Sequence, residues 1–277
     1  MKKWILTISS AVVLMFSASP LLAQNVVENF ENGKIDWSNG VIEAVGIGAP
    51  PANPINMAQA RAMAKRAAVI VARRNLLEVV NGVRIDSKTL VKNFMVESDV
   101  VRAEVQGVLQ HSQVVDISYM SDGSVEATVA MPLTGALTDL VLPKTKGKPE
   151  GPTPQETPGR PAKGVTYTGL VVDARGFRVK PAMSPRILDE DGNEVYGSAS
   201  VSREYAVQQG MAGYAKDLSA AKKNERVTDN PITVKGLRAA SSGQTDIIIS
   251  NEDATLIRSA AQESSFLEKC RVMIVLN

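Results

Sequence analysis

The spacing of apolar residues along the chain changes several times, and these changes predict a mixture of helices and strands. Residues 57–80 repeat small and aliphatic side chains at helical spacing, while basic residues fall off that stripe. The expected stripe is Ala60, Met63, Ala64, Ala67, Ile70, Val71 and Leu77. Because alanine allows close approach, we expect this helix to lie across a sheet. The alternating run at residues 40–48 predicts a strand before it.

A hairpin is predicted after the helix. Residues 101–119 and 124–131 both read as strands, and Asp122-Gly123 between them is a good turn signal. This reading places His111, the chain's single histidine, in a strand. The first part of the chain is then an α+β module of a strand, a long helix and a long hairpin.

The second half of the chain carries another set of short periodic segments. The expected elements are strands at residues 165–174, 232–239, 245–249 and 271–276, a hairpin at 185–196 and a helix at 201–221. Ser250 is expected to begin a further helix, with Asp253 three residues on as in a capping box. The closing strand is apolar and β-branched, so we expect it inside a sheet.

Residues 143–164 separate the two halves. This segment holds six of the chain's 14 prolines and four glycines in 22 residues, with no large apolar side chain. Such a composition predicts a semi-rigid spacer that sets the reach between two domains. We therefore expect an α+β protein of two small domains, at residues 36–142 and 165–277. Each is expected to be a mostly antiparallel sheet packed by one or two helices.

The first 23 residues predict export. Two lysines precede a short apolar run, and small residues lead to a cleavage position after Ala23. The interpretation is a signal peptide at residues 1–23 and a location in the periplasm. No cysteine lies near that junction, so no lipid anchor is expected.

Composition narrows the chemistry further. The chain holds 31 Lys plus Arg against 29 Asp plus Glu, and two of those lysines lie in the expected leader, which predicts no nucleic acid partner. The single cysteine, Cys270, cannot form a disulfide within the chain, and the single histidine, His111, cannot supply a His-rich metal site. A catalytic Cys–His pair could only be built from these two residues. We expect no enzyme activity, no metal and no cofactor.

The candidate contact residues lie in the second domain. Asp173 and Arg175 occupy alternate positions at the end of its first strand, which predicts either a surface ion pair or a contact with a ligand or partner. Four carboxylates also surround Gly192: Asp189, Glu190, Asp191 and Glu194. A tight turn explains them better than a calcium site, because the EF-hand spacing is absent.

The first domain resembles a known family in its glycine, alanine and aliphatic patterns. AVGIG at residues 44–48, the helix sequence ARAMAKRAAVIVARRNLLEVVNGVRI, VQGVL and VEATVAMPL resemble the domain of the twenty-kilodalton-lipoprotein family. They are also similar to the N-terminal domain of flagellar assembly protein T. The resemblance implies a structural or assembly role in a Gram-negative envelope, with no catalytic residues. The lipoprotein cysteine is absent here, and the flagellar protein's later domains do not map onto residues 165–277.

These observations favour a non-enzymatic periplasmic protein that acts as a binding or assembly module through a sheet edge or groove. The expected partners are envelope or outer-membrane proteins, with flagellar basal-body components among the options. The alternative is a small-ligand-binding protein or enzyme that uses Asp173, Arg175 and the nearby acids. That alternative predicts one pocket in which these groups converge.

Overall fold

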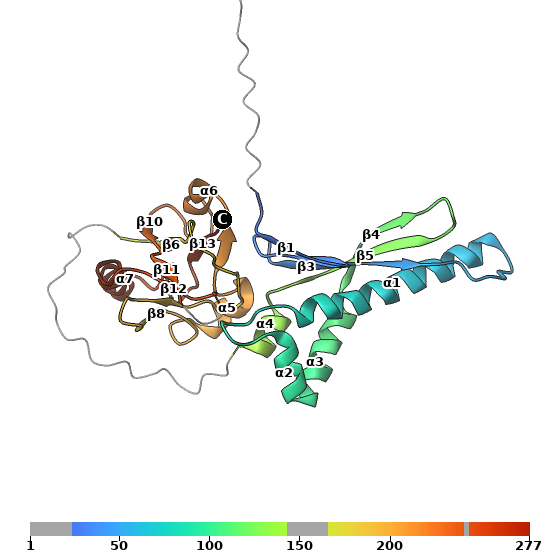
Figure 1. Cartoon of the computed structure of the whole chain (residues 1–277), viewed down its shortest axis with the longest axis horizontal. Coiled ribbons are helices and arrows are strands. Elements are labelled where there is room, and N and C mark those ends of the chain that lie inside the picture. The colour runs from blue at the N-terminus through green and yellow to red at the C-terminus, as the bar shows by residue number, and fades with distance from the viewer. Residues whose placement is uncertain (1–23, 143–165, 241–243) are drawn as a thin grey trace, which may run out of the picture.

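The computed structural model describes residues 24–142, 166–240 and 244–277 (Figure 1). The expected signal peptide and the proline-rich spacer lie outside the described residues. In the described ranges, no helix is both long and apolar enough to cross a membrane. The α+β fold class is confirmed, with antiparallel pairs outnumbering parallel ones among the described strands.

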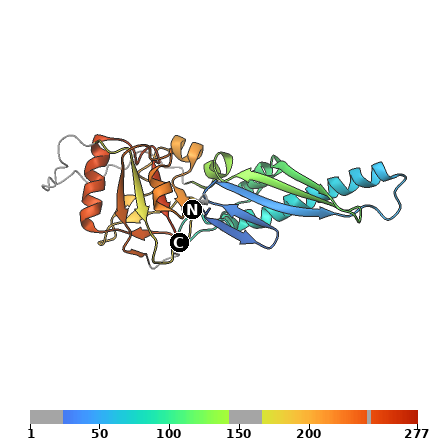
Figure 2. The same ribbon diagram turned by 90° about the horizontal axis from the view of Figure 1, so that it is seen from above.

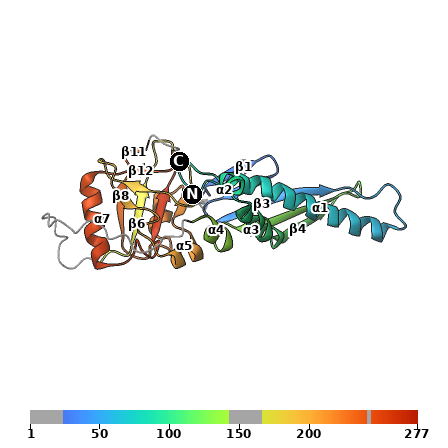
Figure 3. The same cartoon turned by 90° about the horizontal axis from the view of Figure 1, so that it is seen from below.

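The first domain is a five-stranded antiparallel sheet with helices on one face (Figures 1 and 3). Its strands are β1 (Val27–Phe30), β2 (Gly33–Asp36), β3 (Val41–Gly48), β4 (Gln113–Tyr119) and β5 (Val125–Pro132), in the order β1-β2-β3-β5-β4. Its helices are α1 (Met57–Asn81), α2 (Val91–Glu97), α3 (Asp99–Gln110) and α4 (Ala136–Val141). The hairpin of β1 and β2 starts before residue 36, where the sequence pattern places the domain boundary.

The long helix lies directly on the backbone of β3, as its alanine content predicts. A Cβ atom at Gly46 would come 2.1 Å from the backbone nitrogen of Ala72, and one at Gly48 would come 2.1 Å from the carbonyl oxygen of Ala64. The buried stripe differs in detail from the expected one. It repeats every four residues through Ala60, Ala64, Ala68 and Ala72, while Met63 and Ile70 are exposed. Close contact with the strand at Gly46 and Gly48 favours this narrow alanine row.

The expected strand at residues 101–119 is wrong over its first half, which forms α3. Ser98 caps this helix by accepting a hydrogen bond from the backbone N–H of Val101 at 3.3 Å. Val105 and Leu109, four residues apart, face the core and make helical burial possible. His111 therefore ends a helix instead of lying in a strand. The remaining half is β4, and its hairpin with β5 is confirmed.

The second domain contains two four-stranded sheets. The larger sheet, which has the longer strands, is parallel, although we expected an antiparallel sheet. β6 (Gly169–Asp173), β9 (Gly213–Ala215), β10 (Pro231–Lys235) and β13 (Val272–Val275) pair in parallel in the order β10-β6-β13-β9. The closing strand β13 lies inside this sheet, as its apolar sequence predicts. The smaller sheet joins β7 (Ile187–Leu188), β8 (Glu194–Tyr196), β11 (Arg238–Ala239) and β12 (Ile247–Ile248).

The single helix expected at residues 201–221 is also wrong. The segment forms α5 (Arg203–Gln209), then β9, then α6 (Leu218–Lys222). Gly210 ends α5 with a φ of 79°, a conformation that favours glycine, and the chain then joins the parallel sheet. The expected helix start at Ser250 is confirmed, because its side chain accepts from the backbone N–H of Asp253 at the start of α7 (Asn251–Glu263).

The two domains pack directly against each other. Most of their buried apolar side chains form one continuous cluster that spans both domains. The backbone N–H groups of Met183 and Ser184 donate to the carbonyl oxygens of Arg84 (2.9 Å) and Ile85 (2.7 Å). Backbone bonds between the domains fix their relative orientation, which makes the junction a defined part of the structure.

Candidate functional site

Asp173 and Arg175 form a closed ion pair at the carboxyl end of β6. Arg175 donates from Nε to Asp173 Oδ1 at 2.8 Å and from Nη2 to Oδ2 at 2.7 Å. This hydrogen bonding from Arg175 lowers the pKa of the Asp173 carboxyl. Gly176 follows with a φ of 99° and turns the chain. The ion-pair interpretation is present in the structure, while contact with a ligand or partner stays a prediction.

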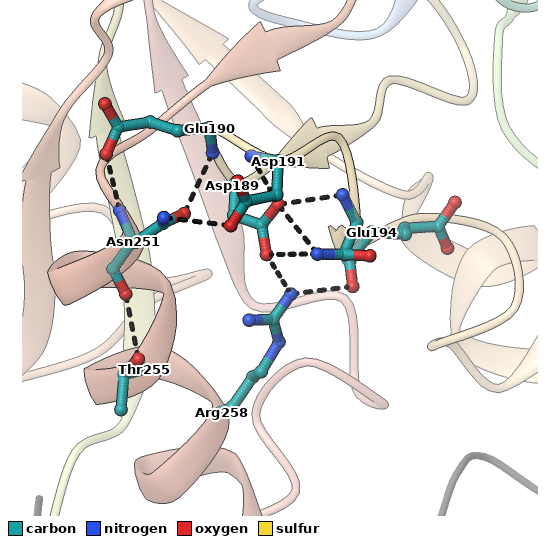
Figure 4. Close-up of polar contacts among 8 residues, drawn as sticks. Asp189, Glu190, Asp191, Glu194, Asn251, Thr255 and Arg258 are labelled. Carbon is teal, nitrogen blue, oxygen red and sulfur yellow. Dashed lines mark hydrogen bonds and ion pairs between the residues drawn. The ribbon is translucent and has the colours of Figure 1, made fainter.

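The acidic turn between β7 and β8 is held by α7 (Figure 4). The buried carboxylate of Asp189 accepts from the backbone N–H of Asn193 at 2.8 Å and from Nη2 of Arg258 at 2.9 Å. Asn251 donates to Glu190 and Asp191, whereas the side chain of Glu194 points away from this group. The acids thus serve the turn and the start of α7. Within the described ranges, no group of three or more His, Cys, Asp or Glu side chains is arranged to hold a metal.

The Asp189 contacts predict an acid-sensitive contribution to stability. Burial raises the pKa of Asp189, but hydrogen bonds from Arg258 and Asn193 outweigh it, and the pKa falls below its usual 3.8. The ionised form therefore stabilises the fold fully above pH 3.8, and this contribution is lost as pH falls through the lower folded pKa. We expect Asp189→Asn to cost about 1–3 kcal/mol at pH 7 and progressively less in acid.

Urea unfolding at pH 7 and at pH 3 measures this difference. Asp229→Asn is the matched control, because it removes the same charge from an exposed position. An equal loss for Asp189→Asn at both pH values would contradict the assignment.

The structure does not bring the two groups into one pocket. The pair of Asp173 and Arg175 ends a strand of the parallel sheet, whereas Asp189 and Glu190 contact α7 beside the smaller sheet. An active site built jointly on Asp173, Arg175 and these acids therefore lacks the convergence that it requires.

A cavity of about 580 Å³ opens at the junction of the domains, and the sequence does not reveal it. The first domain contributes Trp37 and Leu133, and the second contributes Gln208, Met211 and Arg226. These residues come from distant segments and form no motif. Only the packing of the two domains creates this space.

The second unpredicted surface is the β4 edge, the outer side of Gln113–Tyr119. β4 pairs only with β5 among the described strands, so its other side has no strand partner there. Val115 is 54% exposed and Tyr119 59% exposed on this edge. The hairpin and the first half of α1 extend away from the second domain (Figure 2). Arg61 and Lys65 of α1 line a shallow hollow together with Tyr119.

Comparison with known families matches residues 169–277 to the family described as Treponema pallidum Tp0624, second domain. The match covers the second domain from β6 onward and less than half of the chain. A search of curated proteins found no match. These comparisons indicate similarity in the second domain and assign no site residue.

Proposed function

We propose that the protein is a non-enzymatic binding or assembly module of the periplasm that recognises a partner protein through the β4 edge. The observation that carries this proposal is a seven-residue edge strand with exposed apolar side chains. Such an edge offers free backbone donors and acceptors to an extended segment of another protein, which adds as a further strand.

The side chains around the β4 edge favour a particular kind of segment. Val114, Val115 and Tyr119 offer apolar contacts, and Arg61 and Lys65 add positive charge next to Tyr119. An extended segment with apolar side chains and an acidic end is complementary to this surface. A bulge at Val115 interrupts the register with β5, and bulges of this kind limit indiscriminate pairing of edge strands.

The expected signal peptide and the family resemblance support a location in the cell envelope for this function. Together they point to envelope or outer-membrane proteins as partners, with flagellar basal-body components as one option. The direct packing of the domains supports a rigid module that presents the β4 edge at a fixed distance from the second domain. A periplasmic location, non-enzymatic action and flagellar association are parts of this proposal.

Site-specific photo-cross-linking in cells tests the β4 edge. A cross-linking amino acid at Val115 is expected to give discrete adducts with an envelope protein, identified by mass spectrometry. The same amino acid at Leu237, which is 50% exposed in the second domain, is the matched control. We expect Tyr119→Asp to reduce the Val115 adducts at least tenfold, because a carboxylate replaces an apolar contact. Identical adducts at both positions, or none at Val115, would refute recognition through this edge.

A further inference from the structure

The cavity at the domain junction combines an apolar floor with one cation. Its buried apolar lining comes from both domains: Trp37, Leu133, Met183, Met211 and Met273. The volume of about 580 Å³ lies in the range of pockets that hold small organic ligands. Three methionines give this floor a soft, adaptable surface. Arg226 is the only basic residue in the lining, and Glu225 is its only acidic residue.

The guanidinium of Arg226 is only partly used by the protein. Nη1 donates to the carbonyl oxygens of Gly210 at 3.0 Å and Cys270 at 2.9 Å, and Nη2 donates to that of Gln209. An arginine has five N–H donors, so these bonds leave Nε–H and one N–H of Nη2 without an acceptor among the described residues. In a guanidinium, Nε–H and the nearer N–H of Nη2 point the same way and form the fork that binds a carboxylate in a bidentate manner.

Nε of Arg226 is not fully buried. Every buried side-chain nitrogen and oxygen of the described residues has a hydrogen-bond partner, so Nε, which has none, must be accessible. The backbone of Gly213 lies close to Nε, and a Cβ there would come 3.0 Å from Nε and 2.4 Å from Met273 Sδ, so no larger residue fits at this position. Arg175 shows an arginine fork with a carboxylate bound to it, because its Nε and Nη2 donate to both carboxylate oxygens of Asp173.

The positive charge of Arg226 also lacks a counter-ion. No Asp or Glu of the described ranges lies within ion-pair distance of it. Burial lowers the pKa of Arg226, and its charged or titratable neighbours are Tyr196, Cys270 and Tyr214. Burial raises the pKa of Cys270 to about 11 and raises the pKa of both tyrosines, so all three groups are neutral at pH 7. A partly buried cation whose partners are only neutral carbonyl groups favours an anion as a further partner.

We propose that this cavity binds a small organic carboxylate, with its carboxyl group on the Nε and Nη2 fork of Arg226 and its apolar body on the methionine-rich floor. The planar fork favours a carboxylate, and the floor favours an aliphatic or aromatic body over a highly charged one. This site is independent of the β4 edge, since its residues lie at the domain junction.

Calorimetric titration of the purified full chain with hexanoate tests the site, with hexanamide as the neutral match. We expect saturable binding of hexanoate and at least tenfold weaker binding of hexanamide. Arg226→Gln should weaken hexanoate binding at least tenfold. Arg226→Lys should also weaken it, because an ammonium lacks the fork. Arg238→Gln, which removes the same charge from an exposed strand residue, should bind like the unaltered chain.

Gln208→Trp keeps the proposal testable if Arg226 variants do not fold. Gln208 is exposed at the cavity wall, so a tryptophan should fill the space without disturbing the core, and hexanoate binding should fall at least tenfold. Equal binding of hexanoate and hexanamide would overturn the proposal, as would unchanged binding by Gln208→Trp or by folded Arg226→Gln. Binding of inorganic phosphate without binding of hexanoate would overturn the assignment to carboxylates.

Discussion

Replacing Gly46 with alanine is expected to destabilise the protein by about 3 kcal/mol or more. The new Cβ would lie 2.1 Å from the backbone nitrogen of Ala72 and 2.6 Å from the carbonyl oxygen of Ala68. Both atoms belong to the backbone of α1, so no rotation of a side chain can relieve the overlap. β3 is paired with β5 along its whole length and cannot retreat. The helix must therefore move away and lose its contact with the sheet.

Urea unfolding followed by far-UV circular dichroism measures this loss. Gly107→Ala is the matched control, because no atom outside its own helix and neighbours lies within 4 Å of its Cβ position. Alanine in the interior of α3 should stabilise the protein by about 0.5–1 kcal/mol. A cost below about 1 kcal/mol for Gly46→Ala would show that α1 and β3 are not in close backbone contact.

The contact of α1 with β3 shows which parts of the fold local sequence predicts well. Small residues in a long helix and glycines in the strand before it indicate close packing, and both are visible without a structure. The exact set of buried residues on α1 is harder to predict from the sequence. Met63 and Ile70 fit a broad apolar face, yet they are exposed because the first part of the helix buries only its alanine row. The packing of α1 on the sheet therefore determines which of its apolar side chains are buried.

One error in the sequence prediction arises where a single segment fits both the two-residue repeat of a strand and the repeat of a helix. Residues 101–110 satisfy both alternation and the four-residue spacing of Val105 and Leu109, and the cap at Ser98 favours the helix. In the second domain, strand direction depends on which strands become neighbours. β13 enters between β6 and β9 from the end of the chain, a long-range pairing that no local pattern specifies.

The candidate sites also differ in how well the local sequence predicts them. The pair of Asp173 and Arg175 and the turn around Gly192 are local, and both are among the alternatives that the sequence offers, whereas the contact of Asp189 with Arg258 is long-range and has no local signal. The β4 edge depends on the order of strands in the sheet. The cavity at Arg226 depends on the packing of two domains, and an arginine whose donors are partly free has no local sequence signal.

Replacing Trp37 with alanine is expected to cost about 3–5 kcal/mol and to divide unfolding into two steps. Trp37 is only 5% exposed and meets Tyr214 edge to face, with ring centroids 5.8 Å apart. The Tyr214 hydroxyl donates to the Ala182 carbonyl oxygen at 2.7 Å and accepts from its N–H at 3.0 Å, so the ring is held firmly in the second domain. Trp37 therefore joins the first domain to a rigid partner.

The continuous apolar cluster across both domains predicts one cooperative transition for the unaltered chain. Without the indole, the junction loses its aromatic contact and part of its apolar cluster, and keeps its backbone bonds, the bond from Arg84 Nε to the Pro181 carbonyl oxygen and the pair of Arg203 and Asp139. A surface ion pair of this kind stabilises little. Scanning calorimetry should then resolve two transitions. Val129→Ala, a buried change in the middle of the first sheet, should lower stability but keep one transition. A single two-state transition in Trp37→Ala would mean that the domains stay coupled without this aromatic contact.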